Sequence, residues 1–142
     1  MKRILFLCTG NSCRSQMAQA IMNHLGEGRF EAFSAGSKPA GYVHPLAIKI
    51  LEEAKLSAEG LRSKSWEEFQ GQSFDLVITV CDRAKESCPI WAGHPITAHW
   101  GFEDPAEATG SDEQKLRVFR KVFTEIQSRI SSFLNEQSTA MR

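Results

Sequence analysis

The sequence has no net charge and no long run of apolar residues. Lysine and arginine total 17, as do aspartate and glutamate. No overall field therefore draws the chain to nucleic acid or to anionic lipid. No apolar run approaches the roughly 20 residues that span a bilayer. We expect neither a nucleic-acid-binding protein nor a membrane protein.

The N-terminus has only part of a secretion signal. Met1-Lys2-Arg3 before the apolar residues 4–7 resembles the start of a signal peptide, and the cysteine that follows resembles that of a lipoprotein. Four apolar residues are too few, because a signal core has about 7–15. Leu7 also stands where a small residue would be needed before the cysteine. We expect a cytoplasmic, monomeric protein.

Cysteines are scarce. The chain has four, Cys8, Cys13, Cys81 and Cys88, too few and too far apart for a disulfide scaffold. In a reducing compartment such cysteines are catalytic or bind metal. The C-x4-C and C-x6-C gaps are wider than the C-x2-C pairs of zinc sites, and the histidines show no ligand spacing. The sequence therefore predicts no metal and no cofactor.

The 142 residues suit a single domain in which strands and helices alternate. Apolar runs predict strands at residues 2–7, 30–34, 74–80 and 96–100. A helix is expected at about 14–25, with Met17, Ala20, Ile21 and Leu25 on one face, and another starts at His44-Pro45. A capping box at residues 111–114 opens the last helix. The tail, residues 135–142, is expected to fray.

Apolar residues in the last helix recur every three or four positions. They are Leu116, Phe119, Phe123, Ile126, Ile130 and Phe133. The stripe fits a coiled-coil seam or a helix packed on a sheet, and we favour the second. Alternating strands and helices predict an α/β fold: one three-layer domain with a four-stranded, mostly parallel sheet flanked by helices.

Two cysteines directly follow predicted strands. Cys8 ends the first strand and Cys81 ends the run FDLVITV. Ligands of open parallel sheets bind beyond the carboxyl ends of the strands. If both strands are central and parallel, Cys8 and Cys81 lie on the same edge of the sheet.

The loop CTGNSCRS, residues 8–15, has the composition of an oxyanion site. In a loop between a strand and a helix, the backbone N–H groups converge on one point, where the helix dipole adds positive potential. Here these groups belong to Thr9, Gly10, Asn11, Ser12, Cys13, Arg14 and Ser15. Gly10 and Asn11 tolerate left-handed backbone. Arg14 matches two oxygens of an oxyanion, and Ser15 can donate to the sulfur of Cys8. The pattern predicts nucleophilic attack by a thiolate. The alternative is a packed cysteine and a solvated arginine.

C-x5-R-S after an opening strand resembles the low-molecular-weight protein tyrosine phosphatases. CTGNSCRSQMA, VITVCDRAKESCPI and HWGFEDPAE further resemble the arsenate reductases built on that fold, over residues 4 to about 133. The resemblance implies that Asp104 is the general acid. It also implies a relay in which Cys81 attacks Cys8 to release arsenite, and Cys88 then attacks Cys81. Thioredoxin would reduce the final disulfide, although glutaredoxin with glutathione is an open alternative.

Other functions remain open at this point. The chain could be a phosphatase for phosphotyrosine or a small phosphomonoester, or a phosphocarrier module. Against the first, Ala106 and Glu107 follow Asp104-Pro105 where the phosphatases carry aromatic residues. Neither alternative needs a C-x6-C pair. Cys81 and Cys88 could also be two core thiols, Asp104 could simply cap a turn, and Cys13 could pair with Cys8 under oxidation.

The chain departs from the family at a potassium site. Many thioredoxin-coupled members use two acidic ligands beside the anion loop, and the matching residues here are Gln19 and Lys64. A cation there meets too little negative charge. The sequence predicts that Lys64 takes the cation's position and steadies the loop through Asn11 and Ser34. The alternative is a solvated surface lysine.

Overall fold

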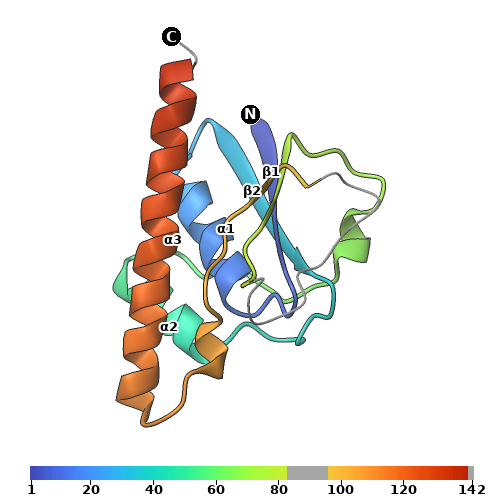
Figure 1. The fold of residues 1–142 in the computed structure, drawn as a ribbon. Helices are drawn as coiled ribbons and strands as arrows, with labels where there is room; N and C mark the ends of the chain where they lie inside the picture. The colour runs from blue at the N-terminus through green and yellow to red at the C-terminus, as the bar shows by residue number, and fades with distance from the viewer. Residues whose placement is uncertain (83–95, 141–142) are drawn as a thin grey trace.

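The computed structural model describes residues 1–82 and 96–140, and its centre is a parallel sheet (Figure 1). The strands are β1 (Lys2–Cys8), β2 (Phe30–Gly36), β3 (Leu76–Thr79) and β4 (Ala98–His99), in the order β2-β1-β3-β4. Each neighbouring pair is parallel. The α/β fold and the four-stranded sheet are confirmed. β3 and β4 are shorter than the predicted runs.

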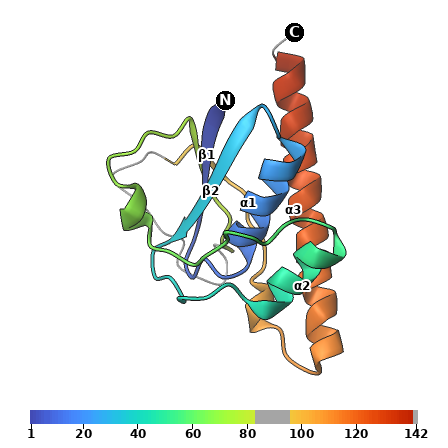
Figure 2. The same cartoon turned by 180° about the vertical axis from the view of Figure 1, so that it is seen from behind.

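The α-helices of the described residues lie along one face of the sheet (Figures 1 and 2). They are α1 (Arg14–Leu25), α2 (Pro45–Glu53) and α3 (Asp112–Ala140), with short 3-10 helices η1 (Trp66–Phe69) and η2 (Pro105–Glu107). The bounds of α1 match the predicted helix. Leu25, expected on its buried face, is 37% exposed because α1 ends there at Gly26.

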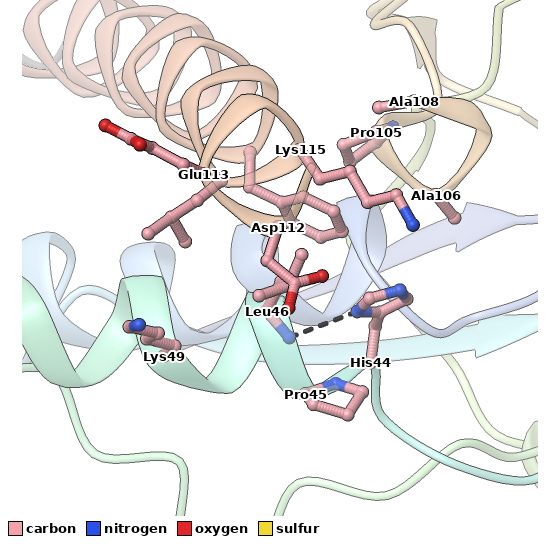
Figure 3. Close-up of a pocket in the computed structure, with 12 residues that line it drawn as sticks. His44, Pro45, Leu46, Lys49, Pro105, Ala106, Ala108, Asp112, Glu113 and Lys115 are labelled. Atoms are coloured by element: carbon pink, nitrogen blue, oxygen red, sulfur yellow. Dashed lines mark hydrogen bonds between the residues drawn. The ribbon is translucent and has the colours of Figure 1, made fainter. Parts of the chain in front are cut away.

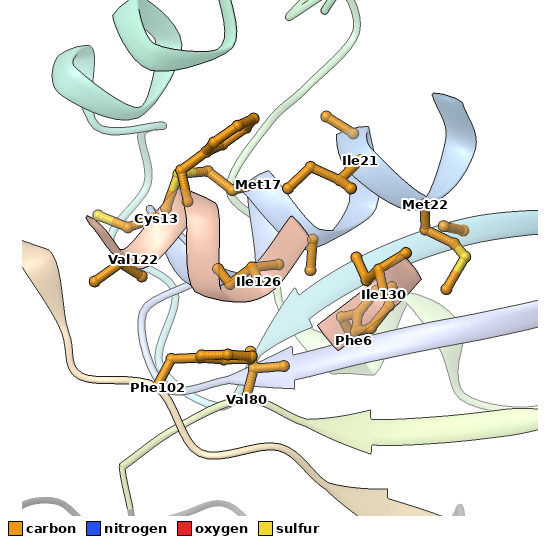
Figure 4. Close-up of a cluster of buried hydrophobic side chains, with 14 of the residues drawn as sticks. Phe6, Cys13, Met17, Ile21, Met22, Val80, Phe102, Val122, Ile126 and Ile130 are labelled. Carbon is orange, nitrogen blue, oxygen red and sulfur yellow. The ribbon is translucent and has the colours of Figure 1, made fainter. Parts of the chain in front are cut away.

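The main core lies between the helices and this face of the sheet (Figure 4). Phe6 of β1, Met17 and Ile21 of α1, and Ile126 and Ile130 of α3 are fully buried. Burial of a side chain of this size contributes about 1.5–3 kcal/mol. This packing anchors the two elements that flank the predicted anion loop, because β1 precedes the loop and α1 follows it.

The second face of the sheet has a smaller apolar cluster. Leu5, Leu7, Ala35 and Val77 pack there with Phe69 of η1. Within the described ranges, η1 is the helix on this face. The sheet therefore has apolar packing on both sides, as parallel sheets require.

The helix α3 packs against the rest of the domain. Its predicted apolar stripe is buried, and it contacts α1 and α2, so it is not a free coiled-coil seam. The helix continues past Asn135, where we expected fraying, and reaches Ala140. Phe133 packs on Phe30 and Trp100, with both ring centroids 5.5 Å away, and Arg29 donates to the carbonyl of Leu134 over 3.0 Å. These contacts attach α3 to the body of the domain at Phe133 and Leu134.

The predicted capping box is present. Gln114 N–H donates to Ser111 Oγ over 3.1 Å, and Ser111 N–H donates to Gln114 Oε1 over 2.8 Å. Within residues 1–82 and 96–140, no helix is long and apolar enough to cross a bilayer.

Candidate active site

Cys8 and Cys81 lie on the same edge of the sheet, as predicted. Cys8 is the last residue of β1, and Cys81 follows β3, which pairs with β1 in parallel. Both side chains are buried. Cys81 is disulfide-bonded, whereas Cys8 and Cys13 are free thiols. Cys88 lies outside the described residues.

Two groups make hydrogen bonds with the sulfur of Cys8. Asn11 N–H donates to Sγ over 3.1 Å, and Sγ lies 2.9 Å from Ser15 Oγ. These contacts fix the position of the sulfur at the base of the loop. The arrangement therefore fits a nucleophile, and the predicted contact with Ser15 is present.

The carbonyl groups of the anion loop, residues 8–15, are held from outside. The N–H groups of Ser37, Lys38, Ala40 and His44 donate in turn to the carbonyls of Cys8, Thr9, Gly10 and Ser12, over 2.9 to 3.3 Å. The carbonyl and the following N–H of one peptide point in opposite directions. The loop N–H groups are thus turned inward, where they can bind an oxyanion.

Asn11 is the residue with left-handed backbone in this loop, at φ 49°. Gly10 was also expected to have left-handed backbone, but its φ is not positive. Asn11 tolerates this conformation because its side chain bonds locally: Nδ2 donates to Ser15 Oγ over 2.6 Å. The Asn11 side chain thereby links the loop turn to the serine beside the nucleophile.

Gln16, which the sequence did not single out, supports Asn11 from behind. Its fully buried Nε2 lies 3.0 Å from both the carbonyl oxygen and Oδ1 of Asn11, and 2.7 Å from the carbonyl oxygen of Arg62. No motif in one sequence distinguishes such a glutamine from an ordinary helix residue. The loop thus depends on a segment about 50 residues away.

Arg14 and Asp104 meet, as predicted for the substrate step. Arg14 Nη2 lies 3.6 Å from Asp104 Oδ2, and Nη1 donates to the carbonyl of Phe102 over 3.1 Å. Asp104 Oδ1 accepts from the N–H of Ala106 over 3.0 Å, so Asp104 also caps η2. The interpretation of Asp104 as a turn cap is confirmed, and its role as general acid stays a prediction.

Cys13 belongs to the core. Its side chain is 2% exposed and lies among the apolar residues of the main core (Figure 4). Burial raises the pKa of Cys13 to about 12, so it remains a neutral thiol. Cys13 can contribute to anion binding through its backbone, whereas its sulfur is a packing group.

Lys64 lies beside the loop rather than free in solvent. Its ammonium donates to the carbonyl of Arg62 over 2.8 Å and lies 3.5 Å from Ser34 Oγ, which donates to Gln19 Oε1 over 2.6 Å. Its backbone N–H donates to Asn11 Oδ1 over 3.0 Å. Burial, with a smaller effect of Arg62, lowers the pKa of Lys64 to about 8. The contact with Asn11 is thus made by the backbone of Lys64.

Together these features describe an enzyme of the class that attacks tetrahedral oxyanions with a cysteine thiolate. A family model described as low molecular weight phosphotyrosine protein phosphatase matches residues 3–141. The chain belongs to this family, as its motifs indicated.

The curated relatives are arsenate reductases. The arsenate reductase of Halalkalibacterium halodurans is 43% identical over 133 residues, which cover 93% of this chain and 94% of that protein. The glutaredoxin arsenate reductase of Synechocystis is 35% identical, with 94% and 97% coverage. The resemblance to arsenate reductases is confirmed.

Solved structures agree with this assignment. An arsenate reductase in a phosphate-binding state superposes with a TM-score of 0.78 at 34% identity, covering 96% of this chain and 98% of the other. A thioredoxin-dependent arsenate reductase from Corynebacterium glutamicum gives a TM-score of 0.72 at 26% identity. It covers 99% of this chain but 63% of that longer chain.

Proposed function

We propose that this protein reduces arsenate to arsenite through a relay of Cys8, Cys81 and Cys88. The observation that carries the proposal is the placement of Cys81. A second cysteine follows the strand beside the one that ends at the nucleophile, on the same edge of the sheet. A phosphatase does not need it, since hydrolysis of a thiophosphate adduct requires only water and a general base.

In the first step Cys8 attacks arsenic. Arg14 and the inward N–H groups hold the arsenate oxygens, and Asp104 protonates the oxygen that leaves as water. A Cys8–arsenic bond forms and an arsenic–oxygen bond breaks. The 3.6 Å separation between Arg14 Nη2 and Asp104 Oδ2 allows both side chains to contact one bound oxyanion.

In the second step the thiolate of Cys81 attacks Cys8 Sγ. A Cys8–Cys81 bond forms, the sulfur–arsenic bond breaks, and its electron pair stays on arsenic, which leaves as arsenite. Cys88 then attacks Cys81 and releases Cys8 as a thiolate. That Cys81 is disulfide-bonded while Cys8 is free supports an end state of this kind.

A small dithiol protein must then supply two electrons to the Cys81–Cys88 disulfide. We propose thioredoxin for this step, in a cytoplasmic, monomeric enzyme. The likeness to the C. glutamicum enzyme supports thioredoxin, and that to the Synechocystis enzyme makes glutaredoxin with glutathione the rival.

The test is arsenate-dependent NADPH oxidation with thioredoxin and thioredoxin reductase, run beside glutaredoxin, glutathione and glutathione reductase. We expect turnover in the first mixture. Cys8→Ser should abolish it together with any hydrolysis of p-nitrophenyl phosphate. Cys81→Ser and Cys88→Ser should stop arsenate turnover but leave slow hydrolysis. Normal turnover by Cys88→Ser with thioredoxin would refute the relay. If the wild-type enzyme turned over in the glutaredoxin mixture but not in the thioredoxin mixture, glutaredoxin with glutathione would be the reductant.

A further inference from the structure

We propose that His44 is a positioning residue of this reaction: its neutral imidazole holds α2 to the anion loop beside Asp104, and its protonation releases that arrangement. The inference rests on the proposed arsenate chemistry. The sequence showed no ligand spacing among the histidines and marked His44 only as the start of a helix.

His44 makes two hydrogen bonds that join two elements. Its backbone N–H donates to the carbonyl of Ser12 over 2.9 Å, which turns the next peptide N–H of the anion loop inward. Its ring Nδ1 accepts from the N–H of Leu46 over 3.1 Å and so caps α2 (Figure 3). One residue therefore connects the N-terminus of α2 to the substrate loop.

The cap requires a neutral ring. A nitrogen that accepts a hydrogen bond carries a lone pair, so the neutral ring has its proton on Nε2. In an imidazolium both nitrogens carry hydrogen. Protonated Nδ1 would face the N–H of Leu46, donor against donor, and the ring would have to turn away.

Two aromatic rings limit where it can turn. The centroid of Phe119, from α3, lies 4.8 Å from that of His44, and the centroid of Tyr42 lies at 6.5 Å. The open direction is a groove of about 590 Å³ between α2, η2 and α3, which His44 lines (Figure 3). Movement into this groove pulls on the main chain that holds Ser12.

Charged groups of the neighbouring elements line the groove or act on the ring. Asp112, Glu113 and Lys115 of α3 and Lys49 of α2 line the groove. Asp104, which precedes η2, acts on the ring through its charge. Burial lowers the pKa of His44 below its ordinary value of 6.5; Asp104 opposes this shift and Lys115 adds to it. His44 is therefore neutral near pH 7 and becomes charged on acidification.

Protonation of His44 therefore acts on the anion loop through the hydrogen bond to the carbonyl of Ser12.

The test compares His44→Asn with wild type and with His24→Asn. Asparagine can cap α2 but does not titrate. His24 is an exposed histidine on α1 and serves as the matched control. The quantity measured is kcat for arsenate at pH 5.5 divided by kcat at pH 8, with KM determined separately. Effects of pH on the rest of the assay are common to all three proteins and cancel in the comparison.

We expect the ratio to rise about threefold or more in His44→Asn, because a residue that stays uncharged keeps the cap at both pH values. His24→Asn should match wild type. An unchanged ratio in His44→Asn would overturn the proposal.

A second readout needs neither a variant nor arsenate. In an NMR titration of the wild-type protein, the ring of His44 should titrate below pH 6.5, and the amide of Cys13, which follows Ser12, should shift with the same midpoint. A Cys13 amide that does not follow His44 would overturn the positioning role. If the Cys13 amide follows the titration of His44 but arsenate is not turned over at any pH, the proposed function is refuted and the positioning role of His44 is not.

Discussion

A β-carbon on Gly36 would lie 2.5 Å from the carbonyl oxygen of Thr9 and 3.0 Å from Cβ of Asn11. Gly36 ends β2 directly beside Cys8 of β1, and its N–H donates to the carbonyl of Lys64 over 2.9 Å. The anion loop therefore sits against the one position of the neighbouring strand that has no side chain.

Gly36→Ala should displace the loop. The added methyl group meets backbone atoms, which cannot rotate away, so we expect a loss of about 1–3 kcal/mol in the free energy of unfolding and at least a tenfold lower kcat/KM. Denaturant unfolding and steady-state kinetics would measure both. Gly10→Ala is the matched control for stability: its φ is not positive and its β-carbon would approach nothing closer than 3.8 Å. Equal destabilisation by the two substitutions would contradict the steric argument.

Gln16→Leu should weaken the loop without touching the substrate. The substitution removes the donor to both oxygens of Asn11 and to the carbonyl of Arg62. Lys64 still donates to Asn11 Oδ1 and to the carbonyl of Arg62, so the carbonyl of Asn11 is the acceptor that loses the donor described for it. Each unpaired group costs about 1–3 kcal/mol. We expect lower stability and slower alkylation of Cys8 by iodoacetamide. Gln70→Leu, at an exposed site, should change neither quantity; wild-type values in Gln16→Leu would show that Asn11 holds its conformation unaided.

Lys64 predicts how the enzyme responds to monovalent cations. Because an ammonium group already lies between the carbonyl of Arg62 and Ser34, replacing potassium by sodium at constant ionic strength should leave kcat nearly unchanged. Lys64→Asp should lower activity in sodium, and potassium should restore part of it. Strong activation of the wild type by potassium would refute the role given to Lys64.

The lowered pKa of Lys64 also predicts a pH dependence of stability. Between about pH 8, its folded pKa, and its ordinary value of 10.5, the unfolded state binds the proton and the folded state does not. Stability contributed by this residue therefore rises with pH across that window. Relative to Lys64→Met, wild type should gain about 1 kcal/mol from pH 8 to pH 10, a modest figure because the side chain is partly solvated. If the stability of wild type relative to Lys64→Met fell between pH 8 and pH 10, the burial of the ammonium group would be contradicted.

Cys13 should be chemically inert. With a pKa of about 12 and 2% exposure, it has almost no thiolate at pH 8. Mass spectrometry after brief alkylation of the reduced protein should find Cys8 modified and Cys13 unmodified. After mild peroxide oxidation, peptide mapping should find no Cys8–Cys13 disulfide; a substantial amount of it would revive the alternative pairing.

Much of the fold followed from local patterns. The bounds of α1 and the Ser111–Gln114 capping box are confirmed, because helix period and end signals are written in adjacent residues. The ends of β3 were less predictable: its apolar run extends beyond the paired residues, and a run does not show where pairing stops. The helix α3 extends beyond the predicted start of fraying to Ala140, and the contacts of Phe133 and Leu134 with residues about 100 positions earlier are tertiary contacts that no local pattern shows.

The sequence by itself determined the chemistry: a cysteine and an arginine six residues apart between a strand and a helix, and a further cysteine after a second strand. These are local features, and parallel pairing brings the strand ends to one edge. Only the tertiary structure decided what holds the loop in its active shape. Gln16, Gly36 and His44 act through backbone carbonyls of distant segments, and every residue type carries the same carbonyl. Their partners therefore leave no signal in the sequence and appear only when the chain is folded.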